Sequence, residues 1–581
     1  MDSQYLNKST FRLSIIKLKF MKKTILLIIL LSSYSLFAQI PRETRAVWVS
    51  TNFKLDWPPP SDNELKQKNE LIKILNNIEN KNLNTIYFQV RSNGTLLFKS
   101  SLEPFSPYIT GKVGKIGNYD PLEFAIEEAH KRGLEIHAWI NTFRIFSGNN
   151  FAIKNHPLHI SQLHPEWTYK KSDNSIWLNP GLPKVREHLI KLVNEIVQNY
   201  NIDGIQLDFI RYPQNQIDDD KSYNQYGNGK PIADWRRENI TNFISQLNRE
   251  IKVTNPKIKL GVTPIGIYKS IPNGRGMEGY SDVFQDTRKW LSDGIIDYAV
   301  PQIYWDAKKA PKFDLLVKDW ITNSYGKNII VGIAAYKPEV YSEIEREINI
   351  TRNLNASGVA FFRYKNIKQK RFYSFAEKSL PAEMPWIEAP PKLAELTLSS
   401  NIKNKKLSLN FTLDKNEISP KGYFALYQKE NSNSDATNKL LKVVPNYISN
   451  ISFALTKPNK INYYYSAIQF DKLWNESSNE SNSTKISVPQ LLEMEKEIEP
   501  FTNPILLQNG EKSSLMVYSN IDEEMCLFKL GITSKTLLSK HFLKKGVNKL
   551  NLNYDLNKYD EVTISYLSTN RSVTLKVGRK R

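Results

Sequence analysis

The sequence predicts a (β/α)8 barrel followed by all-β modules, and the barrel prediction rests on two observations. From Glu43 to about Leu380, short β-rich runs alternate with longer amphipathic stretches, a pattern typical of a parallel sheet covered by helices. Eight such repeats close naturally into a barrel. The competing fold, a doubly wound open sheet, usually carries a glycine-rich phosphate loop after its first strand, whereas the first run here leads into residues 56–60 (DWPPP).

Eight strands are predicted within residues 42–382. They cover residues 44–52, 85–93, 134–142, 204–211, 259–265, 298–305, 328–336 and 358–364. Helices are expected between them, and Pro183 in a first turn and Gly133 just past an end are typical start and stop signals. The predicted helices cover residues 121–132, 183–200, 234–253, 283–292, 313–324, 342–354 and 370–380.

The chain beyond the barrel has a different pattern. Residues 385–391 (PWIEAPP) are typical of a linker. Alternating polar and apolar runs follow, and they predict a β-sandwich over residues 391–488, of the fibronectin type III-like kind. These runs cover residues 406–412, 423–428 and 462–470.

A second small β module is predicted over residues 490–581. Strand signals at residues 513–519 and 561–565 support it. Residues 475–484 (NESSNESNST) are of low complexity and predict a loop or linker before it.

The N-terminal residues predict export. Residues 21–23 (MKK) are basic, residues 24–37 are mostly apolar, and Ala38 is a small residue suited to cleavage, which together are typical of a secretory signal. We therefore expect a signal peptide within residues 1–38, with Met21 as the true start, and a periplasmic, cell-surface or secreted protein. The apolar run is shorter than the roughly 20 residues of a membrane span, and an uncleaved membrane anchor is the alternative.

Composition and charge limit the partners. The chain has one cysteine, Cys526, so no disulfide forms within it, and no cysteine stands at the cleavage point to carry a lipid anchor. The formal charge of +21 predicts attraction to an anionic polymer, with a lysine-rich solvated surface as the alternative. No basic stretch interleaved with aromatic residues indicates nucleic-acid binding, so we expect no nucleic-acid partner.

Polar side chains recur late in several predicted strands, always on one parity. Strand residues of a barrel alternate between its interior and its helix layer, and chemistry sits at the carboxyl ends of the strands. The opposite parity is apolar, as at Val90, Ile140 and Leu207. Burying polar groups is costly unless they are paired or hydrated, so this layer predicts a functional site, with one internal hydrogen-bond network as the alternative. The layer consists of Tyr87, Gln89, Arg91, His137, Trp139, Asn141, Gln206, Asp208, Gln302, Tyr304 and Asp306.

Asp208 is the strongest single candidate for a catalytic residue. It ends the fourth predicted strand, within residues 203–213 (DGIQLDFIRYP). Arg211 would lower the pKa of Asp208 and the apolar flanks would raise it, and the sequence leaves that balance open. An Asp208–Arg211 pair that only braces the loop is the alternative. Aromatic side chains of the kind that suit sugar faces are expected at the same end: Trp57, Trp139, Tyr212, Tyr304 and Trp305.

No metal or other cofactor is expected. Of the seven histidines only His137 falls at a strand end, and no closely spaced pair of histidines lies on a strand to hold a metal. No Gly-x-Ser-x-Gly turn is present. The sequence therefore gives no support for metal or serine-nucleophile chemistry.

A series of motifs runs in order along residues 42–380. They are residues 42–49 (RETRAVWV), 87–91 (YFQVR), 102–106 (LEPFS), 110–111 (TG), 119–122 (YDPL), 129–135 (AHKRGLE), 137–141 (HAWIN), 177–181 (WLNPG), 203–213, 285–286 (QD) with Trp290, and 301–305 (PQIYW). Together they resemble the glycosyl hydrolase-like family 10 of bacterial exported proteins. One departure is Phe143, which follows Asn141-Thr142 where the family commonly has Asn-Pro, and it predicts a less rigid third loop.

The resemblance implies a hydrolase of O-glycosyl bonds that acts on a bacterial polysaccharide. Peptidoglycan glycan strands are one such substrate, with a cell-envelope association. It implies Asp208 as a leading catalytic carboxylate. Two other function classes stay open: a noncatalytic glycan-binding protein on a degenerate barrel, and a cell-surface adhesion or scaffold protein whose β modules carry the function.

Glycoside cleavage generally needs two carboxyl groups, and their separation of about 5–5.5 Å or 6.5–9.5 Å indicates retention or inversion. Beside Asp208, the candidates for the second group are Glu103 in the long second loop and Asp306 past the sixth strand. Asp286 is a weaker candidate because it is also placed to cap a helix. The side chains assigned to substrate binding are Gln89, Arg91, His137, Trp139, Asn141, Asn179, Arg211, Tyr212, Gln302, Tyr304 and Trp305.

Overall fold

The computed structural model of the protein describes residues 42–214 and 217–389 and a series of segments further along the chain. Those segments are 396–403, 406–413, 422–429, 439–453, 462–476, 484–487, 505–509, 512–519, 522–530, 535–544, 546–552, 561–567 and 571–576. The expected signal peptide at 1–38 lies outside the described residues, as do residues 390–391 of the expected linker and most of the low-complexity stretch at 475–484.

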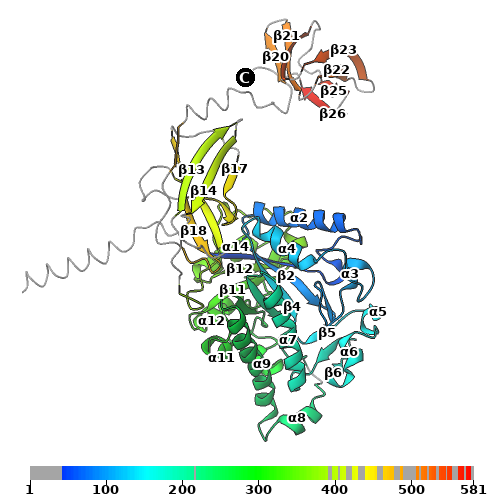
Figure 1. Cartoon of the computed structure of the whole chain (residues 1–581), viewed down its shortest axis with the longest axis vertical. Helices are drawn as coiled ribbons and strands as arrows, with labels where there is room; N and C mark the ends of the chain where they lie inside the picture. Colours follow the sequence, from blue (N-terminus) through cyan, green and yellow to red (C-terminus); the bar gives the residue numbers. More distant parts are fainter. Residues whose placement is uncertain are drawn as a thin grey trace, which may run out of the picture. The chain divides into compact units, whose positions relative to one another are not determined.

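The N-terminal part of the chain forms the predicted closed parallel barrel (Figure 1). Its strands follow one another in chain order, and β1 pairs with both β2 and β12, which closes the sheet. The strands are β1 (Thr44–Val49), β2 (Thr85–Ser92), β4 (Glu135–Asn141), β8 (Gly204–Asp208), β9 (Lys259–Val262), β10 (Tyr298–Ala299), β11 (Asn328–Ile333) and β12 (Gly358–Phe361). Each ends earlier than predicted, because the chain turns at once into the loops at the carboxyl ends of the strands.

Helices cover the outside of the barrel, mostly where the sequence predicts them (Figure 1). The helix between β1 and β2 was not predicted. The longer helices are α2 (Glu64–Asn80), α4 (Pro121–His130), α7 (Pro183–Asn199), α9 (Ile232–Thr254), α11 (Thr287–Ser292), α12 (Phe313–Thr322) and α14 (Ile344–Asn353). Shorter ones are η1 (Asn52–Lys54), α3 (Pro107–Thr110), α5 (Phe151–Lys154), α6 (Ile160–Leu163), η2 (Pro165–Trp167), α8 (Asp220–Tyr226), α10 (Gly279–Asp282), α13 (Pro338–Tyr341) and α15 (Tyr364–Ile367).

The predicted helix at 370–380 is wrong. These residues are irregular and end where Leu380 bridges to Arg42. Their backbone carbonyls accept hydrogen bonds from barrel side chains instead of from a helix. Arg45 donates to the carbonyl of Glu377 at 2.5 Å, and Arg352 donates to that of Ser374 at 2.9 Å. These hydrogen bonds hold the segment against the barrel.

The strand residues divide into two layers, as the parity of the sequence predicts. Trp48, Tyr87, Trp139 and Tyr298 form one inner cluster. Residues of the opposite parity, such as Val90, pack into the large core beneath the helices. The barrel is therefore filled by side chains along its axis, and polar groups inside it need partners.

The amino ends of the strands hold a buried, paired charge. Glu135 at the start of β4 accepts a hydrogen bond from the ammonium of Lys259. It also accepts one from the indole of Trp474 at 2.6 Å, and His137 lies 3.5 Å from its other oxygen. Trp474 belongs to the first β module and stacks on Tyr423 at 4.6 Å between ring centroids. This module therefore completes the floor of the barrel.

The first β module consists of a three-stranded and a four-stranded sheet. Most of its described residues form one compact unit with the barrel. The sheets have the strand orders β13-β14-β17 and β16-β15-β18-β19. Their strands are β13 (Leu396–Lys403), β14 (Lys406–Leu413), β15 (Gly422–Lys429), β16 (Lys439–Pro445), β17 (Asn450–Phe453), β18 (Asn462–Asp471) and β19 (Thr484–Ser487).

The second β module repeats this arrangement, with the orders β20-β21-β24 and β23-β22-β25-β26. Its own core contains Leu515, Leu527 and Ile564. The strands are β20 (Ile505–Asn509), β21 (Lys512–Ser519), β22 (Glu523–Leu530), β23 (Lys535–Leu543), β24 (Gly546–Leu552), β25 (Glu561–Tyr566) and β26 (Arg571–Lys576). Several antiparallel sheets are therefore present in the region where β modules were expected, while the domain bounds and the fibronectin type III-like assignment stay predictions.

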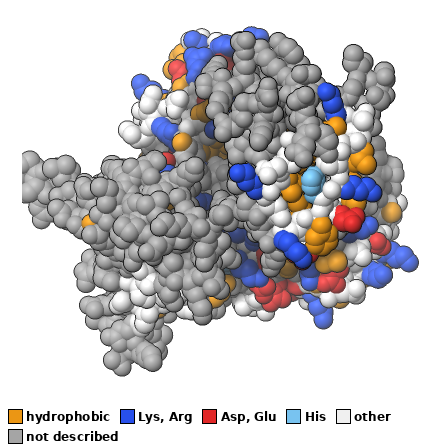
Figure 2. Space-filling view, turned by 90° about the horizontal axis from the view of Figure 1, so that it is seen from above, with side chains coloured by type: hydrophobic (Ala, Val, Ile, Leu, Met, Phe, Trp, Pro, Cys, Tyr) orange, Lys and Arg blue, Asp and Glu red, His pale blue; other side chains and the backbone are white. Residues whose placement is uncertain are grey.

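The described surface is mixed in charge on the face that Figure 2 shows. Lys and Arg side chains are interspersed there with Asp and Glu. This favours a solvated surface over a single basic patch on that face. Among the described helices, none combines the length and apolar character required to span a bilayer.

Glu347 in α14 gives a testable pH dependence of stability. It is fully buried, and neither carboxylate oxygen has a hydrogen-bond partner among the described residues. Burial raises the pKa of Glu347 from 4.5 to about 9, with the charges of Glu343 and Asp306 adding to the effect. The folded protein thus binds a proton that the unfolded chain releases, so stability falls as pH rises from about 4.5 to 9.

We expect Glu347→Gln to remove this slope. The comparison is the free energy of unfolding of the variant minus that of the parent chain. At about 1.36 kcal/mol per pKa unit, we expect this difference to be up to about 3 kcal/mol more favourable at pH 7 than at pH 4. Urea unfolding at several pH values measures it, with the exposed Glu339→Gln as control. Parallel pH profiles for Glu347→Gln and the parent chain would contradict the assignment.

We expect Trp474→Ala to destabilise the barrel and not only the module that carries the residue. The change removes a buried ring and the hydrogen bond to Glu135, at a cost of about 3–5 kcal/mol. Unfolding followed by tryptophan fluorescence measures it. The exposed Phe542→Ala in the second module is the matched control and should change stability by less than about 0.5 kcal/mol.

Candidate active site

Asp208 lies at the carboxyl end of β8, where the sequence placed it. Its Oδ1 accepts the backbone N–H of Phe209 at 2.7 Å, and its Oδ2 accepts the indole N–H of Trp139 at 3.2 Å. The side chain is buried, and burial raises the pKa of Asp208. These two hydrogen bonds and the nearby Arg144 and Arg211 lower the pKa, but less than burial raises it. Burial therefore decides the balance that the sequence left open.

Two guanidinium groups flank Asp208. Arg144 starts β5 (Arg144–Phe146), and Arg211 follows β8 by three residues. The guanidinium of Arg144 lies 3.5 Å from the centre of the Phe209 ring. Arg211 lies 5.0 Å from the ring of Trp177. Burial lowers the pKa of Arg211 to about 10, and repulsion by Arg144 adds to this effect.

The backbone φ of Phe209, the residue after Asp208, is 49°. A left-handed backbone is uncommon for a residue other than glycine, and it turns the chain sharply where β8 ends. The ring of Phe209 is thereby placed against the guanidinium of Arg144, and its backbone N–H against Asp208. The turn after β8 therefore positions both the carboxylate and its cationic neighbour.

A small sheet holds the third loop in place. In it, β5 pairs with β7 (Ile176–Leu178), which in turn pairs with β6 (Thr168–Lys170). Phe143, whose presence predicted a less rigid loop, is fully buried and packs against Phe243 at 5.5 Å between ring centroids. The loop that carries Arg144 is therefore anchored by antiparallel pairing and by a buried ring.

Aromatic rings surround the same end of the barrel. The ring centroids of Tyr304 and Trp139 lie 6.1 and 6.2 Å from that of Phe362. Tyr336 lies 6.2 Å from Tyr304 and is 47% exposed. Burial, together with the charge of Asp208, raises the pKa of Tyr304 well above its usual range, so the phenol stays neutral beside the carboxyl group.

Glu103 and Arg91 form a buried ion pair with each other. The guanidinium of Arg91 donates to both oxygens of Glu103, at 2.8 and 2.5 Å. His188 lies 3.3 Å from one of these oxygens. The charge of Arg91 and the bonds from His188 and Arg91 outweigh burial and lower the pKa of Glu103 to about 2. Glu103 is therefore an ionised partner in a closed ion pair, which does not suit proton transfer.

Gln89 and Asn141 form hydrogen bonds within the protein at the carboxyl ends of β2 and β4. The side-chain oxygen of Gln89 accepts the backbone N–H groups of Thr51 and Asn52 at 3.1 and 2.9 Å. Its amide donates to the side chain of Asn141 at 3.3 Å. These bonds fix the loop after β1 to the ends of β2 and β4.

The side chains of His137, Asn179 and Tyr212 have partners within the fold. His137 is level with Gly204, four residues before Asp208, which places it about 13 Å nearer the amino end at 3.3 Å per residue. Asn179 bonds Ser222 and the turn before α7. The buried hydroxyl of Tyr212 accepts a hydrogen bond from Asn239 at 3.2 Å. Their side chains are thus used within the fold, and the buried Trp57 likewise packs in the core.

The residues after β10 lie in a loop because that strand ends already at Ala299. Gln302, Trp305 and Asp306 are half-buried there. Asp306 accepts the backbone N–H groups of Lys308 and Lys309 at 2.7 and 2.8 Å, and these bonds lower its pKa. Asp286, by contrast, accepts the hydroxyl of Tyr268 at 2.7 Å and makes no side-chain cap to α11.

Several residues of this site were not predicted from the sequence: Arg144, Phe209, Trp177, Tyr336 and Phe362. Phe209 directly follows Asp208, so its neighbourhood was visible in the chain. Arg144 and Trp177 belong to the short strands β5 and β7, whose pairing the barrel pattern does not reveal. Tyr336 and Phe362 fall within predicted strands, but β11 and β12 end before them, so strand parity does not place their side chains. Among the described residues, no group of three His, Cys, Asp or Glu side chains gathers to hold a metal.

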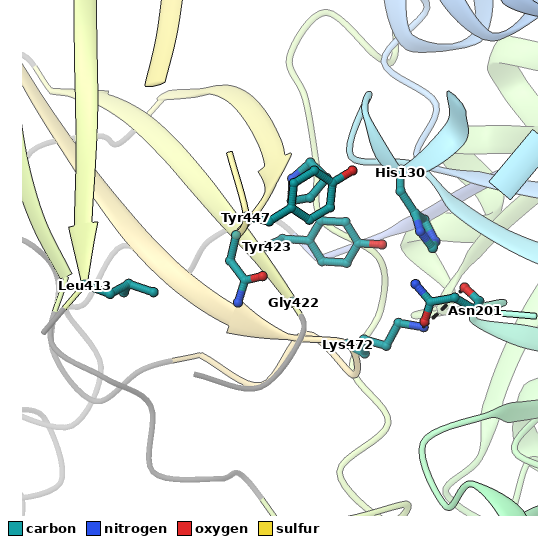
Figure 3. Close-up of a pocket in the computed structure, with 9 residues that line it drawn as sticks. His130, Asn201, Leu413, Gly422, Tyr423, Tyr447 and Lys472 are labelled. Carbon is teal, nitrogen blue, oxygen red and sulfur yellow. Dashed lines mark hydrogen bonds between the residues drawn. The ribbon is translucent and has the colours of Figure 1, made fainter. Parts of the chain in front are cut away.

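A cavity of about 540 Å³ lies at the other end of the barrel, between loops that precede β4 and β8 and the first β module (Figure 3). Tyr423 and Tyr447 point toward His130, and Lys472 donates to the side chain of Asn201 at 2.7 Å. His130 bonds Asp203 at 2.9 Å. Lys472 thus already links the module to the barrel, and the cavity is separate from the Asp208 site.

The matching family model and two similar proteins are described as glycosyl hydrolases or glycosyl hydrolase-like. The family model described as glycosyl hydrolase-like 10 matches residues 43–348. The glycosyl hydrolase YngK of Bacillus subtilis (strain 168) is 32% identical over 491 residues, which are 77% of this chain and 94% of that protein. The glycosyl hydrolase DigH of Escherichia coli (strain K12) is 33% identical over 336 residues, 53% of this chain and 76% of that protein.

Solved structures are more distant. The catalytic domain of β-amylase from Paenibacillus polymyxa is 15% identical and covers 56% of this chain and 94% of its own, with a TM-score of 0.38. The α-L-fucosidase isoenzyme 2 from Paenibacillus thiaminolyticus is 11% identical and covers 90% of this chain and 100% of its own, also with a TM-score of 0.38. Scores this low carry no argument about function.

We expect Glu103→Gln to lower the free energy of unfolding and not to remove a catalytic group. Removing one partner of a buried ion pair leaves Arg91 uncompensated, at about 3–5 kcal/mol. In the parent chain this contribution is present above the unfolded pKa of about 4.5 and is lost as pH falls toward 2. Urea unfolding between pH 3 and 7 measures both, and the double variant Arg91→Met with Glu103→Leu should recover much of the loss. A variant of unchanged stability would contradict this role.

Proposed function

Because the chain belongs to the glycosyl hydrolase-like 10 family, we propose that it is a glycoside hydrolase that cleaves O-glycosyl bonds of a bacterial polysaccharide. The observation that carries the proposal is Asp208, a buried carboxyl group of raised pKa at the carboxyl end of β8. Active sites of this barrel fold lie at that end of the strands. The rings of Trp139, Tyr304 and Tyr336 nearby support binding to the faces of sugars.

Asp208 is suited to the role of the general acid. A raised pKa keeps a proton on the group at a pH where an exposed aspartate has lost it, so it can protonate the glycosidic oxygen as the bond to the leaving sugar breaks. The second carboxyl group would act as base or nucleophile at the anomeric carbon. Asp306 is the proposed partner, because the backbone N–H groups that it accepts lower its pKa and favour the ionised form that a base or nucleophile needs, whereas Glu103 is held in an ion pair by Arg91.

Bacterial cell-wall glycan strands are the proposed substrate, and export is part of the proposal. The basic and apolar residues at 21–38 support a secretory signal, which would deliver the protein to the cell envelope or beyond. A noncatalytic glycan-binding protein is the alternative, and it is favoured by the ion pair that takes Glu103 out of the set of free carboxyl groups.

Release of reducing ends tests the proposal. The chain from residue 39 to 581 is incubated with peptidoglycan, peptide-stripped glycan strands and a panel of bacterial polysaccharides, beside Asp208→Asn and Asp306→Asn. Losing a general acid should lower the rate by about 10²–10⁴-fold. The exposed Asp62→Asn is the matched control and should keep the parent rate.

The pH profile adds a second readout. If Asp208 donates the proton, the rate of the parent chain falls as pH rises through the pKa of Asp208, because the ionised form has no proton to give. Equal rates for Asp208→Asn and the parent would exclude Asp208 from catalysis. Binding of a glycan without release of reducing ends by any of the chains would replace the hydrolase with the glycan-binding protein.

A further inference from the structure

Arg144 and Arg211 form no ion pair with any of the residues that the structure describes. Among the described residues, no carboxylate oxygen lies within 4 Å of either guanidinium, and the one side-chain hydrogen bond of Arg211 goes to the carbonyl of Tyr212 at 3.2 Å. Asp208 and the exposed Asp173 act on Arg144 only at longer range. Two half-buried cations therefore stand beside one carboxyl group.

This arrangement differs from the other buried charges of the barrel. Arg91 reaches both oxygens of Glu103, and Lys259 bonds Glu135 directly. A buried charge without a partner is costly, and the two guanidinium groups also repel each other. Their pKa values are lowered by burial, as expected for cations in a site that lacks an anion.

The rings beneath the two groups hold them in position. Phe209 lies 3.5 Å from the guanidinium of Arg144 and 5.5 Å from that of Arg211, and Trp177 lies 5.0 Å from Arg211. Stacking on an aromatic face leaves the N–H groups at the edge of a guanidinium free to bind another group. The pair is thus positioned before any ligand arrives.

We propose that Arg144 and Arg211 bind the carboxylate of an acidic sugar unit next to the bond that Asp208 cleaves. The inference rests on the proposed function and makes the substrate an anionic glycan. Planar guanidinium groups match a carboxylate through paired hydrogen bonds, which gives them preference over a neutral sugar hydroxyl. The carboxylate comes either from a uronic acid or from the lactyl ether of a muramic acid unit, and these two sources require separate tests.

Matched pairs of glycans test the proposal. One pair is peptide-stripped cell-wall glycan strands with free lactyl carboxylates and the same strands with the carboxyl groups reduced to alcohols. The other pair is oligogalacturonate and its carboxyl-reduced form. Calorimetric binding to the Asp208→Asn chain and kcat/KM for reducing-end release by the parent chain are both measured.

We expect the acid form of one pair to be preferred by about tenfold to hundredfold, the usual effect of a hydrogen bond to a charged group. Arg144→Gln and Arg211→Gln should abolish that preference by weakening the binding of the acid form far more than that of the reduced form, while Arg211→Lys should keep part of the preference. Arg249→Gln, on the exposed side of α9, is the matched control and should keep the full preference. Circular dichroism checks that each variant is folded.

Equal binding of acid and reduced forms in both pairs, or no binding to any of the four glycans, overturns the proposal. So does an equal loss of both forms in Arg211→Gln, which would indicate a structural role. Acid preference without release of reducing ends would refute the proposed hydrolase and leave this inference standing. The preferred pair then identifies the source of the carboxylate.

Discussion

The pairing of buried charge is the constraint on which the rest of the structure depends. The interior of the barrel is filled with side chains, so an ionised group there needs a partner within hydrogen-bond distance. Glu135 finds Lys259 at the amino ends of the strands, and Arg91 finds Glu103 beside the second loop. Among the described residues, Asp208 accepts hydrogen bonds from neutral donors alone, and burial raises its pKa. The paired charges stabilise the barrel, whereas Asp208 accepts no hydrogen bond from a charged group among the described residues.

The first β module takes part in this frame. Trp474 donates to Glu135, and Lys472 donates to the carbonyl of Ile202 just before β8. Both contacts lie at the amino ends of the strands, the face that contributes to stability in barrels of this fold. The module therefore acts as the floor of the barrel, and the carboxyl ends are left for chemistry.

The site combines a rigid frame with groups that await a ligand. The turn at Phe209 and the small sheet of β5, β6 and β7 fix Asp208 and Arg144 relative to each other. Holding such groups in place before binding reduces the entropy lost when a substrate is ordered. The half-exposed ring of Tyr336 and the half-buried guanidinium of Arg211 are the parts left accessible to a sugar.

The sequence by itself determined the eight strands, their order and the parity of their side chains, because alternation and helix signals are local properties of the chain. It also placed Asp208 at a strand end. Only the tertiary structure decided that Glu103 is held by Arg91 and that His137 lies deep in the barrel, because both depend on loop paths and on register between neighbouring strands. Arg144 likewise reaches Asp208 through the pairing of β5 with β7, two segments far apart in sequence. A pattern along one chain cannot contain such contacts, since they form between segments that meet only on folding.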